Sequence, residues 1–277
     1  MKLGVYSLVT PDCDIEEAAA LVADVGYTGI EWTLDYTNAL WDGESNWHID
    51  TGNLAETAER ARRAADEHGL TTVALGSRCG CFDPDRVRVA LEAARLAGAL
   101  GVRVHAPGYD GSTHHDELLR RGRDAFAALE EDARAAGVKV WVEIHNGLIC
   151  PSASAMRRLL DGFDPAWIGA IFDPGNMLRE GMENWRMAVQ MLGPYLQHVH
   201  AKDGGWFRRD DGEWECRNMP FPDGMVNWPQ VIEALGSVGY EGFLDIEDFR
   251  SGYARVSPDL PTRRMLQEDY DYLSGLL

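Results

Sequence analysis

Four ionisable side chains in the second half of the sequence each stand at the end of a short apolar run that is typical of a buried β-strand. They are Glu143, Asp173, His200 and Glu247. Three carboxylates and one imidazole make an oxygen-rich ligand set for a divalent cation, and the set leaves coordination positions for water or a substrate. Such ligands favour Mn²⁺, with Co²⁺, Mg²⁺ and Zn²⁺ as alternatives.

A single acidic residue at a strand end has an equally good structural explanation, because it can be solvated or can cap the following helix. Four such residues at the same end of successive strands are much harder to explain in that way. The sequence therefore predicts one divalent-metal site, on the condition that the fold brings these four strand ends together.

The elements that must position these residues alternate regularly along the chain. Eight short apolar runs are typical of strands, and they cover residues 3–8, 28–33, 71–76, 102–106, 138–144, 168–172, 196–202 and 243–247. Helical patterns separate the runs. In the first, Asp14 is a candidate N-cap, apolar residues recur at helical spacing from Ile15 to Val25, and Gly26 ends the helix. Eight strand–helix units in 277 residues predict an α/β fold, a (β/α)₈ TIM barrel.

Neighbouring strand ends of such a barrel share one rim, so the ends of the last four strands converge on one point. No linker rich in Gly, Ser or Pro interrupts the series, which predicts a single domain over residues 1–277. A doubly wound open sheet is the alternative fold, but the sequence has no Gly-rich phosphate-binding turn. Two long stretches, 35–50 and 203–227, are predicted to be irregular loops at the rim, where barrel enzymes place specificity loops.

The composition limits the classes of partner. Asp and Glu number 45 against 26 Lys and Arg, which gives a formal net charge of −19. A surface this acidic repels phosphate backbones and anionic lipid, so we expect neither a nucleic-acid nor a membrane partner. No apolar run reaches the roughly 18 residues of a membrane span, and the N-terminus has no signal-peptide pattern. Five cysteines form no even disulfide framework, so we expect a cytoplasmic protein, and a homo-oligomer is compatible with the sequence.

Short motifs around the four candidate ligands resemble those of the sugar isomerase/epimerase superfamily of xylose isomerase-like barrels. The motifs are Val142–Gly147 (VEIHNG), Phe172–Asn176 (FDPGN), His198–Asp203 (HVHAKD) and Leu244–Glu247 (LDIE). The resemblance covers nearly the whole chain, and it is specific for the superfamily rather than for one substrate. It implies a TIM barrel with one catalytic divalent metal, whose ligands are Glu143, Asp173, His200 and Glu247.

Six further residues are candidates for binding a small carbohydrate substrate: His105, His145, Asn176, Lys202, Trp32 and Arg217. The superfamily places polar groups around its substrate, and this arrangement implies a role for His145 and Asn176. Lys202 lies on the same strand face as His200, where an ion pair with a ligand carboxylate is an equal alternative. The other three have structural alternatives, as a structural histidine, a core tryptophan and a solvated loop arginine.

A metal between two glutamates predicts proton transfer at a carbon next to a carbonyl, through an enediolate. Glu143 and Glu247 are the candidate catalytic base and acid. We therefore predict a metal-dependent isomerase or epimerase that acts on a keto-sugar or related polyol. The same intermediate can expel a β-leaving group, so a lyase or dehydratase is the alternative reaction. An abasic-site endonuclease would bind DNA, which the net charge argues against, and a non-catalytic sugar-binding barrel would need no metal ligands.

Overall fold

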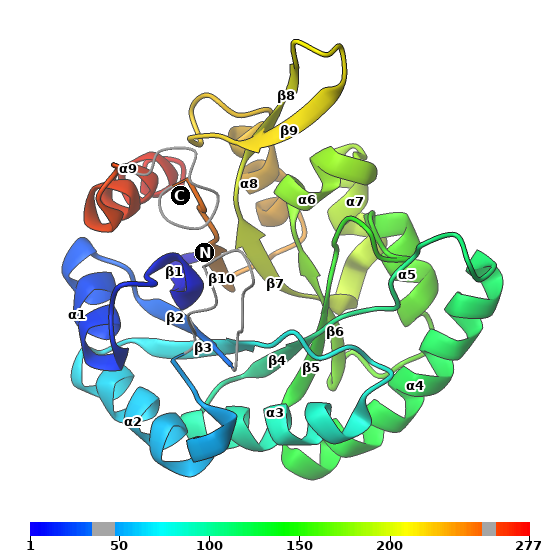
Figure 1. The fold of residues 1–277 in the computed structure, drawn as a ribbon, viewed down its shortest axis with the longest axis horizontal. Coiled ribbons are helices and arrows are strands. Elements are labelled where there is room, and N and C mark those ends of the chain that lie inside the picture. The colour runs from blue at the N-terminus through cyan, green and yellow to red at the C-terminus, as the bar shows by residue number, and fades with distance from the viewer. Residues whose placement is uncertain (35–47, 251–258) are drawn as a thin grey trace.

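Eight parallel strands close into a barrel in the computed structural model, which describes residues 1–34, 48–250 and 259–277 (Figure 1). Around the barrel the strands follow the order β1-β10-β7-β6-β5-β4-β3-β2. Their bounds are β1 Lys2–Tyr6, β2 Gly29–Thr33, β3 Thr71–Gly76, β4 Gly101–Val104, β5 Lys139–Glu143, β6 Ile168–Phe172, β7 Leu196–Ala201 and β10 Phe243–Ile246. The predicted (β/α)₈ TIM barrel is confirmed, and each predicted strand is present.

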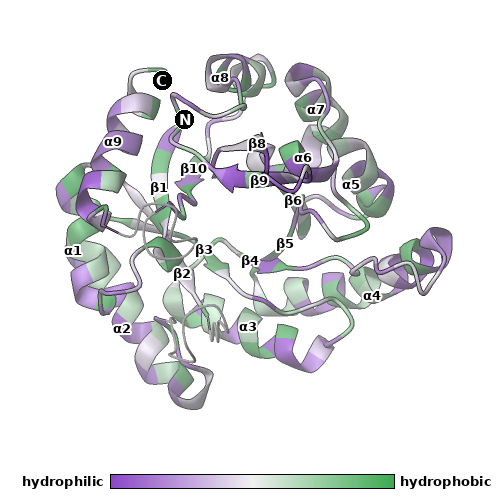
Figure 2. Cartoon of the chain, turned by 45° about the horizontal axis from the view of Figure 1, so that its top comes forward, coloured by the Kyte–Doolittle hydropathy of each residue, from purple (hydrophilic) through white to green (hydrophobic). Residues whose placement is uncertain are grey.

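Helices ring the barrel and cover the outer face of the strands (Figures 1 and 2). Their bounds are α1 Ile15–Val25, α2 Leu54–Glu67, α3 Pro84–Ala97, α4 His115–Ala136, α5 Ala153–Leu160, α6 Pro174–Glu180, α7 Trp185–Leu192, α8 Trp228–Ser237 and α9 Thr262–Ser274. Buried apolar side chains of these helices and of the strands join in one large core cluster. The strand ends that carry the candidate site are therefore held by a packed, rigid scaffold.

The first helix shows how local sequence sets an element's limits. Asp14 accepts a hydrogen bond from the backbone N–H of Glu17, and the Glu17 side chain accepts one from the backbone N–H of Asp14, which makes a capping box. The residues that helical spacing selects are the ones that α1 buries. Gly26 follows with a φ of 117°, a conformation that favours glycine, and the chain turns there into the next strand.

Residues 203–227 differ from the prediction, because they contain an antiparallel hairpin rather than an irregular loop. Its strands are β8 Gly204–Arg208 and β9 Trp214–Asn218. The hairpin projects from the rim beside α6, and it is largely hydrophilic in Figure 2. The Trp206 indole N–H donates to the Leu178 carbonyl at 2.9 Å, which fixes the hairpin to α6.

One buried carboxylate joins the two ends of the segment 203–227, here called the β7–α8 excursion. Asp203 accepts hydrogen bonds from the backbone N–H of Gly204 at 2.7 Å and of Val226 at 3.0 Å. It also accepts one from the Trp228 indole at 3.1 Å, at the start of α8. The chain therefore leaves the barrel and returns to it at the same carboxylate.

Smaller differences concern the rim. The first strand ends at Tyr6 and continues as a 3₁₀ turn over Ser7–Val9, and α6 is a helix that the periodicity did not predict. Most of the predicted loop 35–50 lies outside the described residues. No helix in the described part of the chain is both long and apolar enough to cross a membrane.

Candidate metal centre

The structure brings together the four side chains that the strand ends predict as ligands. Glu143 ends β5, Asp173 follows β6, His200 lies in β7 and Glu247 follows β10. One potential ligand atom from each lies within 4.8 Å of the others, and all four residues are at most 2% exposed. His200 Nδ1 is 3.0 Å from Glu143 Oε1 and 3.3 Å from Glu247 Oε1.

Two cationic side chains, the buried Arg103 and the partly buried Lys202, neutralise part of this cluster. Lys202 Nζ lies 2.7 Å from Asp173 Oδ2 and contacts Glu247 as well. Arg103 Nη1 reaches both glutamates, at 3.2 Å from Glu143 and 3.4 Å from Glu247. The ion-pair alternative for Lys202 is thus present in the structure, and it does not remove Lys202 from the cavity that a substrate would enter.

The charge pattern of the cluster fits a divalent cation. The pKa of Asp173 is raised to about 7, because burial and the neighbouring carboxylates of Glu143 and Glu247 together outweigh the opposite effect of Lys202. Crowded carboxylates of this kind are stabilised by a cation placed among them. An imidazole and three carboxylates within 4.8 Å of one another are also a suitable donor set for Mn²⁺ or a related ion.

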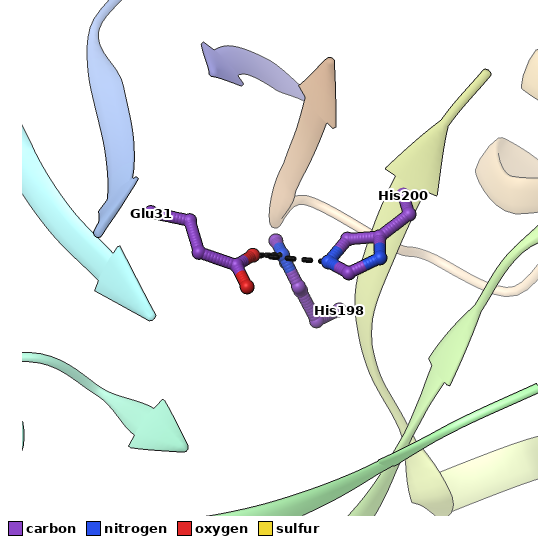
Figure 3. A group of neighbouring side chains, drawn as sticks. All are labelled: Glu31, His198 and His200. Carbon is purple, nitrogen blue, oxygen red and sulfur yellow. Dashed lines mark hydrogen bonds and ion pairs between the residues drawn. The ribbon is translucent and has the colours of Figure 1, made fainter. Parts of the chain in front are cut away.

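A second buried layer lies beneath the cluster and orients its histidine (Figure 3). His200 Nε2 donates to Glu31 Oε2 at 2.9 Å, and His198 Nε2 lies 3.2 Å from the same oxygen. His198 Nε2 is also 3.3 Å from Asp245 Oδ2. All four side chains are at most 1% exposed. Because Glu31 accepts the Nε2 proton of His200, the Nδ1 atom is the one that faces the three carboxylate ligands.

Electrostatic interactions favour the charged forms of His200 and Glu31. Burial alone would lower the pKa of His200, but Glu247, Glu31 and Glu143 raise it well above its usual value. Burial alone would raise the pKa of Glu31, but the two imidazoles hold it below its usual range. Without a metal, His200 is therefore an imidazolium that donates from both ring nitrogens, and a metal ion would take the place of its Nδ1 proton.

A cavity of about 550 Å³ opens above the cluster. Four of the six predicted substrate-binding residues line it, namely His105, His145, Asn176 and Lys202. The imidazole rings of His105 and His145 are 6.0 Å apart and nearly parallel. Burial lowers the pKa of His105 to about 3 and also lowers that of His145, so both rings are neutral at physiological pH. The Asn176 amide donates to Asp173 at 2.7 Å and to Glu143 at 3.2 Å, which orients two of the ligands.

The structure places the other two predicted residues outside the lining of this cavity. Trp32 is fully buried in the core, with its ring 5.4 Å from that of His48. Since strand side chains alternate, Trp32 must face the helices when Glu31 faces the barrel interior. Arg217 is an exposed residue of β9 that pairs with Glu215, whereas the next residue, Asn218, lines the cavity.

Sequence reasoning missed several residues of the cavity wall. They are Tyr6, Leu8, Arg78, Arg103, Asn146, Leu148, Arg179, Asn218 and Phe249. A signal was available for Arg103, because it lies two residues before His105 and shares its strand face. No comparable signal marks Arg179, which depends on the helix α6 that the sequence pattern did not reveal.

Residues 19–275 match the family model described as xylose isomerase-like TIM barrel. The chain therefore belongs to the family of xylose isomerase-like TIM barrels.

Three known proteins are similar to the chain over most of its length. A putative L-ribulose-5-phosphate 3-epimerase from Escherichia coli K12 is 26% identical over 259 residues, which cover 89% of this chain and 88% of the relative. The structure of a 3-keto-D-glucoside 4-epimerase from E. coli superposes with a TM-score of 0.73 at 18% identity, over 99% of both chains. The IOLI protein, whose structure holds a zinc atom, gives a TM-score of 0.77 at 15% identity, over 100% of this chain and 99% of the other. These two structural likenesses show the shared fold.

Proposed function

We propose that this protein is a divalent-metal-dependent sugar isomerase or epimerase that acts on a keto-sugar or related polyol. The observation that carries the proposal is the buried cluster of Glu143, Asp173, His200 and Glu247 at the C-terminal rim of the barrel, beneath a cavity of about 550 Å³. Barrel enzymes place their active sites at this rim. The names of the relatives, which include ribulose-5-phosphate and keto-glucoside epimerases, support the same class of reaction.

The two glutamates are suited to move the proton. Both line the cavity, and they reach the cluster from β5 and β10, which are separated by two strands in the barrel. One carboxylate removes a proton from the carbon next to a carbonyl, and the other returns a proton. Return to the opposite face of the same carbon gives an epimer, and return to the neighbouring carbon gives the aldose–ketose isomer. When bound, the metal would polarise the carbonyl and stabilise the enediolate, and we propose Mn²⁺ as the ion.

The remaining lining residues hold the substrate and the proton carriers in place. Burial would raise the pKa of Glu143, but Arg103, His200 and Lys202 hold it well below its usual value, so Glu143 is ionised, as a general base must be before it accepts a proton. Arg103 and Lys202 also pair with Glu247. The neutral ring of His105 has one donor and one acceptor nitrogen, which suits a sugar hydroxyl. His145 donates from Nδ1 to the Asn146 carbonyl at 2.6 Å, so its Nε2 remains as an acceptor.

Chelation tests the dependence on a metal. Removal of bound ions should abolish turnover of a panel of ketoses and their phosphate esters, and added Mn²⁺ or Co²⁺ should restore it. NMR spectra recorded in D₂O would identify the carbon that exchanges its proton. Full turnover by metal-free protein would refute the proposal.

Substitution of the glutamates tests the proton carriers. Glu143→Gln or Glu247→Gln should remain inactive even in excess Mn²⁺, because an amide cannot exchange protons as a carboxylate does. The exposed Glu233→Gln is the matched control and should keep full activity. An isomerase or epimerase conserves the substrate's mass apart from incorporated deuterium. A second, smaller product in stoichiometric amount would instead identify a lyase.

A further inference from the structure

The cavity wall beyond the metal ligands is cationic. Arg78, Arg103, Arg179 and Lys202 line it, and among the described residues its carboxylates are only Glu143 and Glu247. Two of these cations, Arg103 and Lys202, are bound to the ligand carboxylates. In a chain with a net charge of −19, a wall that adds arginines and no further acid departs from the composition of the rest of the molecule.

Arg179 lines the cavity and forms no ion pair with an acidic residue in the part of the chain that the structure describes. Its guanidinium donates to the Cys216 carbonyl and to Asn218 Oδ1, each at 3.4 Å. Both partners are neutral, and 3.4 Å is long for a hydrogen bond from nitrogen to oxygen. The side chain is half-buried. A guanidinium in this setting can form much stronger, charge-assisted bonds to an oxyanion that enters the cavity.

The position of Arg179 relates it to the reacting end of a substrate. Asp173 is the N-cap of α6, and Arg179 lies six residues further along the same helix. At roughly 1.5 Å per residue, the two backbone positions are about 9 Å apart. This separation is comparable with the length of an extended sugar chain. A substrate whose carbonyl lies at the metal cluster can therefore place its far end beside Arg179.

We propose that the substrate carries an anionic group, a phosphate ester or a carboxylate, at the end remote from the reacting carbon, and that Arg179 binds this group together with Asn218. The proposal rests on the proposed isomerase or epimerase function and names its substrate class. Because Asn218 Oδ1 accepts from Arg179, its amide nitrogen remains as a second donor for the oxyanion. Arg78 lines the same cavity and adds positive potential there.

A purely structural role for Arg179 makes different predictions. In that role the arginine would only fix the hairpin to α6, and its loss would affect all substrates alike. In the proposed role its loss raises KM for charged substrates and leaves neutral ones unchanged. Comparison of substrates that differ only in the terminal group therefore distinguishes the structural role from the anion-binding role.

The experiment uses metal-loaded protein and three forms of the same ketose: the free sugar, its terminal phosphate ester and its terminal carboxylate. We expect the wild-type protein to prefer at least one anionic form over the free sugar, and the preferred anion identifies the source of the charge. Arg179→Gln should raise KM for that anion by about 10- to 100-fold, the loss expected for a charge-assisted pair, with little change in kcat. Arg179→Lys should restore part of the affinity.

The matched control is Arg209→Gln, since Arg209 is an exposed arginine of the same excursion that pairs with Asp211. It should leave all three KM values unchanged. Inorganic phosphate supplies a readout that needs no turnover: in calorimetry, wild-type protein should bind it more tightly than Arg179→Gln does. Equal KM increases for charged and neutral substrates in Arg179→Gln, or equal phosphate affinity in the two proteins, would overturn the anion site. Absence of turnover with every sugar would count against the proposed function, while the phosphate titration would still test the site.

Discussion

Removal of the negative charge from Glu31 should weaken metal binding although Glu31 does not touch the metal. Its carboxylate is fully buried and bonds His200 Nε2 at 2.9 Å and His198 Nε2 at 3.2 Å. Glu31→Gln preserves the volume of the side chain and can still accept from His200, but the imidazole becomes a weaker ligand. If the new amide turns its N–H group toward His200, the ring must carry its proton on Nδ1, where the metal has to bind.

The expected loss of metal affinity depends on whether the new amide in Glu31→Gln presents its oxygen or its N–H group to His200. Loss of a carboxylate that supports a ligating histidine reduces metal affinity by about 10- to 100-fold, or about 1.4–2.7 kcal/mol. We expect the lower value if only the charge is lost and the upper value if the tautomer reverses. Once the variant is saturated with Mn²⁺, its kcat should be close to that of the wild type, because Glu31 positions a ligand and transfers no proton in the reaction.

Competition between the protein and a fluorescent chelator for Mn²⁺ measures the affinity. ¹⁵N NMR of the His200 ring in metal-free protein reports which of its nitrogens carry a proton. Glu233→Gln, an exposed substitution of the same type, controls for the change in net charge. Thermal unfolding of the metal-free variants controls for loss of fold. An unchanged Mn²⁺ affinity in a folded Glu31→Gln protein would refute the assignment of Glu31 as the residue that orients His200.

Three further predictions concern stability. Lys202→Met should destabilise metal-free protein by about 3–5 kcal/mol, because it removes the ion pair of the buried Asp173 and one of the ion pairs of Glu247. Mn²⁺ should recover part of the loss, and equal losses of melting temperature with and without Mn²⁺ would contradict this. Gly4→Ala should lower the free energy of unfolding, measured in urea, by about 1–3 kcal/mol, because the new Cβ would lie 2.0 Å from Asp245 Oδ1. Its control is Gly236→Ala, which should not destabilise the protein because the new Cβ has no neighbour within 4 Å. Asp14→Ala should cost about 1 kcal/mol through the lost cap of α1 and leave Mn²⁺ affinity unchanged, a result that calorimetry would check.

The sequence predicts the barrel well because its strands and helices carry strong periodic patterns. The hairpin β8–β9 escaped prediction because it lies on the surface, begins with two glycines and has a charged turn, so it shows no clear apolar alternation. The candidate ligands could be located because parallel strands must end at one rim. The contacts of the layer formed by Glu31, His198 and Asp245 could not be located from the sequence. They join residues of β2, β7 and β10 that only the closed barrel brings together.

The carboxylate of Asp203 separates the hairpin that follows β7 from the barrel, so that the hairpin can be varied independently. The two ends of the excursion meet at this one side chain, which is held by the backbone of Gly204 and Val226 and by the indole of Trp228. If Phe221, which is buried and packs against Trp228, is kept, the hairpin between these two ends can therefore be shortened, lengthened or randomised without pulling on His200 in β7 or on Lys202 just after it. A library that keeps Asp203 and Phe221 and varies only the hairpin β8–β9 would change what the cavity accepts while it keeps the metal ligands in place.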